Sequence, residues 1–375
     1  MPKFLIIVDH RLNRSPSQRY RFEQYLGFFK TNGFDWELSE IITEKDDRIF
    51  YGYGNYFAKA WILLKSIFIR FNDLRRAKHF DLIFIQREAL LLGSSYFEKQ
   101  FFKKHKVVFD FDDSIWLLDT SPENKKFEFL KNPDKTKINI AHAHYVIAGN
   151  SFLANYAKQF NQNTTVIPTT IDSDFHIPKP ELRNMALDSP ETSSGQAAQT
   201  DKKIVIGWSG SISTIKHFEI AIPALKQIQN KYPNKIEIHV IGQGSYTHPE
   251  INVVSKNWSS KTEVDDLNCF NIGIMPLPDD EWVKGKCGLK GLSYMACGVA
   301  TVMSKVGVNS EIIKQGKNGY LAQTEQEWVD YLSLLIENSD LRHRIGQAGR
   351  ETVVKNYSVN AHKDAYLEVL KSLIK

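Results

Sequence analysis

The chain has 375 residues, of which 42% are hydrophobic and 24% charged; this composition is typical of a folded globular protein and excludes a disordered, collagen-like or coiled-coil chain. The length predicts two domains, since domains run to roughly 100–200 residues. Lys and Arg outnumber Asp and Glu by 26 to 21 in residues 1–180 and equal them at 22 each in the remainder, so the net charge of +5 belongs to the first half, where it favours an anionic partner.

Short apolar runs in the first half alternate with stretches of helical spacing. The apolar runs predict strands over residues 4–8, 81–86, 107–111, 145–148 and 164–168. Apolar spacing over 18–30 predicts a helix, and Asn150 is a typical helix N-cap. Strands that alternate with helices indicate a parallel sheet of Rossmann type, so residues 1–180 are predicted to form a first α/β domain.

A stretch of small and polar residues, 181–203, separates this domain from a second alternating pattern and predicts a linker. The second pattern predicts strands over 203–210, 236–242, 251–254, 271–277 and 299–304, and helices over 216–231, 288–297 and 325–338. Residues 204–356 are therefore predicted to form a second doubly wound domain. In such domains ligands bind beyond the carboxyl ends of the strands, so an interdomain cleft there is the expected site.

The segment GIMPLPDDEWVKGKCGLKGLSYMACGVATVMSKVGVNSEIIKQGKNGYLA (273–322) resembles the donor-binding region of glycosyltransferase family four, retaining enzymes of the GT-B fold. Residues 207–219 occupy the place of that family's Gly-x-Lys phosphate loop, and 341–358 resemble its closing helices. Residues 11–26 and 107–116 resemble a bacterial subgroup that builds surface polysaccharides.

The resemblance implies two facing Rossmann-like domains, the first binding an acceptor and the second a nucleotide-sugar. It also implies that the last helix, 357–375, crosses back to the first domain. The implied reaction is retaining transfer of a sugar to a surface glycan (capsule, O-antigen or exopolysaccharide) or its polyprenyl carrier.

The chain departs from the family at two glutamates, whose places are taken by Gly285 and Ser293. The family's carboxylate contacts to the donor therefore do not carry over. Glu281 is the candidate that replaces one of them, with Asp279 and Asp280 as alternatives.

A leaving diphosphate needs positive charge and N–H donors, which a helix N-terminus with nearby lysines supplies. Trp258 is expected to stack on the nucleobase, and no metal is expected to be required. The predicted donor-binding residues are Gly210, Ser211, Lys216, Trp258, Lys286, Gly288, Leu289, Lys290, Ser293 and Glu311.

In the first half, Asp112 and Asp113 follow a predicted strand, where they are expected to orient acceptor hydroxyls or balance the developing cation. They are the predicted catalytic residues, together with Glu281. Arg19 and Arg21 are predicted to bind a phosphate of a lipid-linked acceptor, because arginine contacts phosphate in a bidentate manner.

Residues 56–71, YFAKAWILLKSIFIRF, combine apolar residues with Lys59, Lys65 and Arg70. Two interpretations remain open for this stretch: docking on an anionic membrane surface, or a core helix of the first domain. No apolar run reaches the roughly 20 residues of a membrane span, and the opening FLIIV is shorter than a secretory signal. Three cysteines without a CxxC pair favour a reduced, cytoplasmic protein, peripheral at the membrane if it docks.

Other functions fit parts of the sequence. The run VVFDFDDSI matches the first motif of haloacid-dehalogenase-type phosphatases, in which Asp110 would be the nucleophile, Asp112 the acid and base, and Mg²⁺ the cofactor. The same aspartates would hold Mn²⁺ in a GT-A glycosyltransferase. Loss of the paired glutamates allows an inactive GT-B scaffold. Nucleic-acid binding is not predicted, because the basic run 70–79 is too short.

Overall fold

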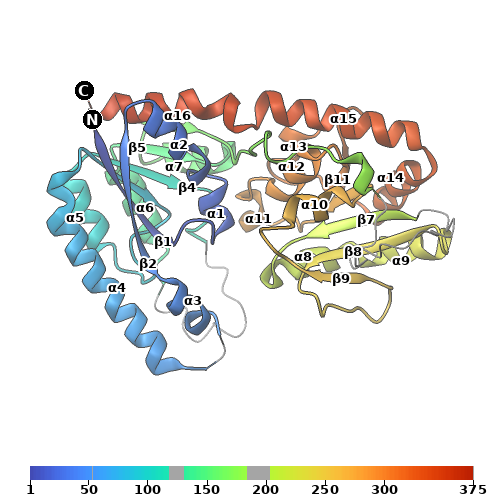
Figure 1. Cartoon of the computed structure of the whole chain (residues 1–375), viewed down its shortest axis with the longest axis horizontal. Coiled ribbons are helices and arrows are strands. Elements are labelled where there is room, and N and C mark those ends of the chain that lie inside the picture. The colour runs from blue at the N-terminus through green and yellow to red at the C-terminus, as the bar shows by residue number, and fades with distance from the viewer. Residues whose placement is uncertain (53, 118–130, 184–202, 375) are drawn as a thin grey trace, which may run out of the picture. The chain divides into compact units, whose positions relative to one another are not determined.

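The computed structural model describes residues 1–52, 54–117, 131–183 and 203–374 (Figure 1). The chain forms two compact units. The first contains residues 1–170, 285–287 and 362–375, and the second contains 171–284 and 288–361. The main run of the first unit thus ends before the predicted boundary at residue 180, and residues 362–375 of the predicted last helix are grouped with it. Most of the predicted linker, residues 184–202, lies outside the described residues.

The sheet of the first unit has six parallel strands in the order β2-β1-β3-β4-β5-β6. The strands are β1 (Lys3–His10), β2 (Asp35–Ile42), β3 (Leu82–Gln86), β4 (Val107–Phe111), β5 (Tyr145–Ala148) and β6 (Thr164–Val166). All five predicted strands of this half are present. The strand that the sequence did not reveal, β2, lies at the edge of the sheet, where most of its side chains are only partly buried.

Helices cover both faces of this sheet. They are α1 (Pro16–Arg19), α2 (Leu26–Thr31), α3 (Glu44–Phe50), α4 (Tyr56–Arg76), α5 (Tyr96–Lys104), α6 (Asp134–His142), α7 (Ser151–Lys158) and α16 (Val359–Ile374). Side chains of α5, α6 and α7 join one hydrophobic core with β1, β3, β4 and β5. On the other face, Phe29 packs on Phe4, and Tyr366 of α16 packs on Tyr25. The predicted helix 18–30 is wrong as one piece, because α1 and α2 are separated by a short 3-10 turn.

The second unit also has a six-stranded parallel sheet, in the order β12-β11-β10-β7-β8-β9. Its strands are β7 (Ile204–Ser209), β8 (Ile236–Gly242), β9 (Val254–Asn257), β10 (Ile272–Met275), β11 (Ala300–Ser304) and β12 (Tyr320–Ala322). The predicted strand 251–254 is misplaced, since β9 begins at Val254, and β12 is not apparent in the sequence. Both are edge strands, so neither needs a continuous apolar run.

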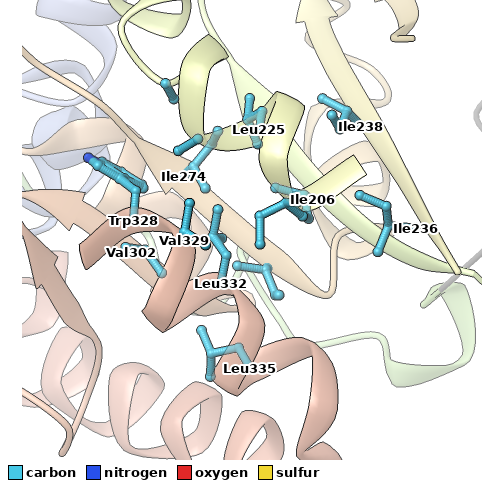
Figure 2. Packing of buried hydrophobic residues seen from close by; sticks show 14 of the residues in the cluster. Ile206, Leu225, Ile236, Ile238, Ile274, Val302, Trp328, Val329, Leu332 and Leu335 are labelled. Atoms are coloured by element: carbon cyan, nitrogen blue, oxygen red, sulfur yellow. The ribbon is translucent and has the colours of Figure 1, made fainter. Parts of the chain in front are cut away.

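The helices of the second unit are α8 (Ile215–Glu219), α9 (Ile222–Lys231), α10 (Glu263–Asn268), α11 (Glu281–Lys284), α12 (Leu289–Ala296), α13 (Asn309–Ile312), α14 (Glu325–Glu337) and α15 (Ser339–Asn356). Side chains from α9 and α14 pack against the strands in one buried core (Figure 2). The predicted helix 216–231 is divided, because Pro223 lies in the first turn of α9 and cannot continue a helix from the N-terminal side.

The predicted α/β class with two Rossmann-like doubly wound domains is confirmed. In each sheet the strand order reverses at one place, between β1 and β3 in the first unit and between β7 and β10 in the second. Ligands of doubly wound domains bind beyond the carboxyl ends of the strands at this reversal. The residues that follow β1, β3, β7 and β10 are therefore the first to consider for function.

Candidate functional site

In the second unit, α12 begins close to the end of β7. Its N-cap, Gly288, has a backbone φ of +72°, which favours glycine, and a Cβ there would come within 2.5 Å of the side chain of Ile312. The hydroxyl of Tyr294 in α12 accepts a hydrogen bond of 2.8 Å from the backbone N–H of Ser209 in β7. The Tyr294 contact ties α12 to the carboxyl end of β7.

Lys290 lies in the first turn of α12 and places a positive charge near the carboxyl end of β7. Its Nζ stands 5.6 Å from the ring centre of Trp208, a buried residue of β7. A Cβ on Gly210 would lie 2.4 Å from the Trp208 ring and 2.7 Å from Cε of Lys290, so these three residues are neighbours. Sequence analysis did not identify Trp208 as a neighbour of Lys290, because it looks like one more apolar residue of a buried strand. Its position shortly before Gly210 was the available signal.

Five further donor candidates lie on exposed or partly exposed segments of the same unit. Ser211 and Lys216 are exposed in the turn after β7 and in α8. Trp258 follows β9 and is 38% exposed, and Glu311 is exposed in α13. Leu289 begins α12 and is partly buried. Their side chains are accessible to a ligand, and their donor role stays a prediction.

Two other candidates have different surroundings from those expected. Ser293 is buried, and its hydroxyl donates a hydrogen bond of 2.9 Å to the carbonyl of Leu289 one turn earlier, which corrects its assignment as a donor contact. Glu281 is exposed and forms an ion pair of 2.5 Å with Lys284 within α11. A replacement of the absent glutamates by Glu281 stays a prediction.

The structure corrects the prediction for Lys286. Residues 285–287 belong to the first unit, where Nζ of Lys286 donates to Oδ2 of Asp113 at 3.0 Å. The side-chain amide of Asn150, the predicted N-cap of α7, donates to the carbonyls of Gly285 and Lys286 at 3.0 Å each. Lys286 is therefore held by an ion pair with Asp113 of the first unit.

The glutamate missing at position 285 has a steric explanation. A Cβ on Gly285 would lie 2.1 Å from Oγ and 2.7 Å from the backbone nitrogen of Ser114. No side chain fits there unless the backbone moves. The family's carboxylate is thus excluded by the way residues 285–287 pack on the first unit.

Asp110 of β4 is fully buried and serves the core of the first unit. Its carboxylate pairs with the guanidinium of Arg21 at 2.5 Å and accepts a hydrogen bond of 3.2 Å from Tyr366 of α16. Arg21 is also fully buried and donates to the carbonyl of Ile167. The assignment of Arg21 to the acceptor is therefore wrong, because its guanidinium does not reach solvent. A phosphatase with Asp110 as nucleophile is excluded for the same reason.

Asp112 and Asp113 lie just past β4 and are held by Arg87, which follows β3. Nε of Arg87 donates to Asp112 at 2.7 Å, and Nη2 donates to Asp113 at 3.2 Å. The two carboxylates raise the pKa of the guanidinium, whose burial opposes them. Arg87 has a φ of +62°, an uncommon conformation for any residue other than glycine, and its N–H donates to the carbonyl of Asp110 at 2.7 Å. Sequence analysis missed Arg87, although a charged residue directly after an apolar strand is a usable signal.

Arg19, the second acceptor candidate, is half-buried. Its guanidinium lies 5.1 Å from the ring centre of Tyr20. Its role toward an acceptor stays a prediction.

The end of β1 carries two titratable side chains that the sequence analysis did not single out. Burial raises the pKa of Asp9 to about 8, with Glu88 adding to the shift and Arg70, Lys135 and Arg87 opposing it. Burial, with the positive charge of Arg14, lowers the pKa of His10 to about 4. Both groups are thus mainly uncharged near neutral pH. Two polar residues directly after the apolar run FLIIV were the available signal.

Over residues 1–52, 54–117, 131–183 and 203–374, no three His, Cys, Asp or Glu side chains are grouped so that they could hold a metal ion. Within the same ranges, no helix has the length and apolar character to cross a membrane.

Residues 203–338, which contain β7, α12 and the contact between Lys290 and Trp208, match the family Glycosyl transferases group 1. The match covers the chain from β7 to α14. A curated relative, N-acetyl-alpha-D-glucosaminyl L-malate synthase of Bacillus anthracis, is 30% identical over 94 residues, which cover 24% of this chain and 25% of the relative. The chain spans half or less of the length of the curated relatives that it matches.

Solved structures resemble the whole chain. Sucrose-phosphate synthase of Thermosynechococcus elongatus superposes with a TM-score of 0.71 at 14% identity, covering 100% of this chain and 99% of that one. HepE of Anabaena, solved with UDP-glucose, superposes with a TM-score of 0.62 at 15% identity and 99% coverage of both chains. The chain thus has the GT-B fold, as the resemblance implied.

Proposed function

We propose that the protein is a glycosyltransferase that moves a sugar from a nucleotide-sugar to a glycan or a lipid-linked acceptor. The observation that carries the proposal is Lys290, held over Trp208 at the start of α12, where the strand order of the second unit reverses. A departing diphosphate accumulates negative charge, and a positioned ammonium beside backbone N–H groups stabilises that charge. The UDP-glucose bound by the structurally similar HepE supports a nucleotide-sugar donor.

The finer parts of the proposal rest on the sequence resemblance. They are retention of configuration, a role in surface polysaccharide synthesis, and transfer without a metal, with the cation of Lys290 in place of a divalent ion at the diphosphate.

We expect Lys290→Ala to weaken UDP-sugar binding by roughly 10- to 100-fold, since a charge-assisted hydrogen bond contributes about 1.5–3 kcal/mol. Thermal-shift titrations with UDP-, GDP-, ADP- and CMP-sugars, each repeated with EDTA, measure the effect and identify the base. Lys226→Ala is the matched control, because Lys226 is an exposed lysine of the same unit, paired with Glu250. Equal donor affinities of Lys290→Ala and the control would remove Lys290 from the site, and loss of binding in EDTA would contradict the metal-free reaction.

A second candidate function, an inactive scaffold that binds a nucleotide-sugar without transferring it, is favoured by one observation. The two glutamate positions of the family hold Gly285, which has no room for a side chain, and Ser293, which is buried. An enzyme should slowly hydrolyse the bound nucleotide-sugar, whereas a scaffold should not. Measuring the release of free sugar separates the two.

We also propose that the protein docks on an anionic membrane surface through α4. The solvent-facing side chains of this helix are nearly all apolar: Phe57 is 97% exposed, and Trp61 and Phe68 are each 64% exposed. The remaining exposed apolar residues of the helix are Tyr56, Leu64 and Phe71. The core-helix interpretation is therefore wrong for this face, which forms a continuous apolar stripe of the kind found at membrane interfaces.

The charges around the stripe favour an anionic lipid surface over a second protein copy. Helix α5 packs beside α4 (Figure 1). The exposed cations of the two helices are Arg75, Lys99, Lys103 and Lys104. The acidic residues of these helices, Asp73 and Glu98, are both buried. Two copies would bring cations together, whereas each cation near an anionic leaflet contributes about 1 kcal/mol to binding.

The protein should co-sediment with vesicles of phosphatidylglycerol and phosphatidylcholine at low salt, and be released as the ionic strength rises. Trp61→Ser and Phe68→Ser should each weaken this binding about tenfold, because each variant loses one large apolar side chain that would be buried in the lipid. Their melting temperatures should stay near that of the wild type. Phe175→Ser, an exposed aromatic of the second unit, is the control. Binding that ignores both salt and lipid charge would contradict the proposal.

A further inference from the structure

The amino edge of the first sheet, opposite the edge where doubly wound domains bind their ligands, gathers exposed basic side chains. Lys106 precedes β4, and its carbonyl accepts a hydrogen bond of 2.9 Å from Ile83 of β3. His144 precedes β5, and its N–H donates to Val107 of β4 at 2.9 Å. The short 3-10 helix Ala77–His79 leads to this edge, and α5 and α6 end there. We call the following exposed residues the basic edge: Lys78, His79, Lys103, Lys104, Lys106 and His142.

The lysines of the basic edge are not neutralised by neighbouring carboxylates. Among the described residues, none of these four lysines forms an ion pair. Asp81, the carboxylate just before β3, accepts a hydrogen bond of 2.7 Å from the backbone N–H of Lys3. Glu37 on the neighbouring β2 is already shared by Lys3 and Arg76. The positive charge of this edge is therefore left to an external partner.

The positive field of the lysines is felt by two histidines beside them. Burial and the charge of Lys104 lower the pKa of His105, which lies between α5 and β4. Burial and the charge of Lys106 lower the pKa of His144 in the same direction. A bound anion would oppose these lysine charges, so the edge is electrostatically suited to negative ligands.

The corresponding edge of the second sheet shows that such lysines can be paired internally. Lys203 precedes β7 and pairs with Glu237 near the start of β8 at 3.1 Å. Lys231 ends α9 and pairs with Glu337 at the end of α14 at 3.5 Å. Attraction of cations to helix C-termini applies in both units and accounts for a lysine at the end of α5. It does not account for Lys106, which precedes a strand, or for the lack of acidic partners at the basic edge among the described residues.

The side chains of the basic edge favour carboxylates over other anions. Its cations are lysines and histidines, whereas bidentate recognition of phosphate favours arginine. Phe80 and Phe102, which precede β3 and lie near the end of α5, are buried and offer no face on which a nucleobase could stack. The large exposed apolar side chains that could insert into lipid lie along α4 instead. A stretch of polypeptide rich in Asp and Glu matches these features.

We infer that the basic edge of the first unit is a docking surface for an acidic segment of another protein, whose carboxylates contact Lys78 and Lys106 at the entries to β3 and β4. This surface is independent of the proposed sugar transfer, because it lies at the edge of the sheet opposite the carboxyl ends of the strands. Its contacts are exposed, so binding is reversible and is screened by salt.

The test measures binding of a fluorescent poly-L-glutamate peptide to the full chain by anisotropy. The wild type should bind the peptide at low salt and release it as the ionic strength rises. Lys78→Glu combined with Lys106→Glu should weaken binding about tenfold or more, because two attractions become repulsions. Neither lysine belongs to the helices proposed to dock on a membrane, so vesicle binding should change less than in Trp61→Ser.

A matched control separates this surface from the net charge of the protein. Lys235→Glu combined with Lys261→Glu makes the same change in net charge at exposed lysines of the second unit and should bind the peptide within about twofold of the wild type. Both double variants should keep melting temperatures near that of the wild type, because the substituted side chains are exposed. If the edge variant unfolds, Lys78→Gln combined with Lys106→Gln carries the test and should weaken binding about threefold or more.

Three results would overturn the inference. The first is absence of peptide binding at low salt, or an equal loss of binding in the edge and control variants. The second is tighter binding of double-stranded DNA or inorganic polyphosphate than of the peptide, lost in the edge variant, which would assign the edge to a phosphate polymer. The third is a loss of binding to phosphatidylglycerol vesicles in the edge variant as large as that in Trp61→Ser, which would assign the edge to the lipid surface. Binding of nucleotide-sugars should be the same in the edge variant and the wild type, so the proposed function is tested separately.

Discussion

Replacing Arg21 by methionine is expected to lower the free energy of unfolding by about 3–5 kcal/mol, the effect of removing one partner of a buried ion pair. Among the described residues, the substitution leaves the carboxylate of Asp110 in the core of the first unit with only Tyr366 as a side-chain partner. It also leaves the carbonyl of Ile167 without the Arg21 hydrogen bond. The loss should therefore exceed the effect of any surface arginine.

Urea denaturation of the wild type and the variant measures this difference. Arg75→Met, at an exposed arginine of α4, should change the free energy of unfolding by less than about 1 kcal/mol and serves as the control. The double variant Arg21→Met with Asp110→Leu should recover much of the loss, because it removes the unpaired charge. A single-variant loss no larger than that of the control would show that Asp110 stays solvated or protonated at no cost.

Replacing Asp9 by asparagine is expected to raise the free energy of unfolding by as much as about 5 kcal/mol at pH 8. The pKa of Asp9 is raised by burial to about 8, from 3.8 in the unfolded chain. The folded state therefore retains a proton that the unfolded state has released. The stability that protonated Asp9 contributes is fully present below pH 4 and is lost as the pH rises through 8. Asparagine does not ionise, so the variant does not lose this stability.

Unfolding measured between pH 4 and 8 checks the sign of this effect. The wild type should lose stability relative to Asp9→Asn across this window, because Glu88 repels the Asp9 carboxylate and the cations of Arg70, Lys135 and Arg87 do not offset its desolvation. Tyr51, whose pKa Asp9 raises, titrates above the window. Asp330→Asn, at an exposed carboxylate of α14, is the control, and its free energy of unfolding should change with pH in parallel with that of the wild type. Parallel curves for Asp9→Asn would mean that Asp9 is ionised and solvated.

The central strands were predictable because they are buried on both faces and must be continuously apolar. The predictions for β4, β5 and β8 agree with the structure to the residue. The strands that were missed or misplaced, β2, β9 and β12, are all edge strands, where half of the backbone and many side chains face outward. Their sequences need not be apolar, so composition alone does not mark them.

The donor half of the site was partly predictable, because a glycine followed by lysine at a turn-to-helix junction has a local cause. Gly288 and Lys290 lie where the pattern predicts a helix start. The role of Trp208 was not predictable, since a buried strand tryptophan has the same sequence signature whether or not a lysine lies over its ring.

By itself the sequence determined the class of fold, the buried strands and the first turn of α12, since these follow from hydrophobic periodicity and from the conformational demands of glycine and proline over a few residues. Only the tertiary structure decided which charged residues are sealed in the core and which lie at the carboxyl edge of a sheet. Arg21 and Arg87 look alike in the sequence, yet Arg21 is sealed in an ion pair with Asp110, and Arg87 holds Asp112 and Asp113 at an edge. The partner of a charge is set by contacts between residues far apart in the chain, and no local pattern records it.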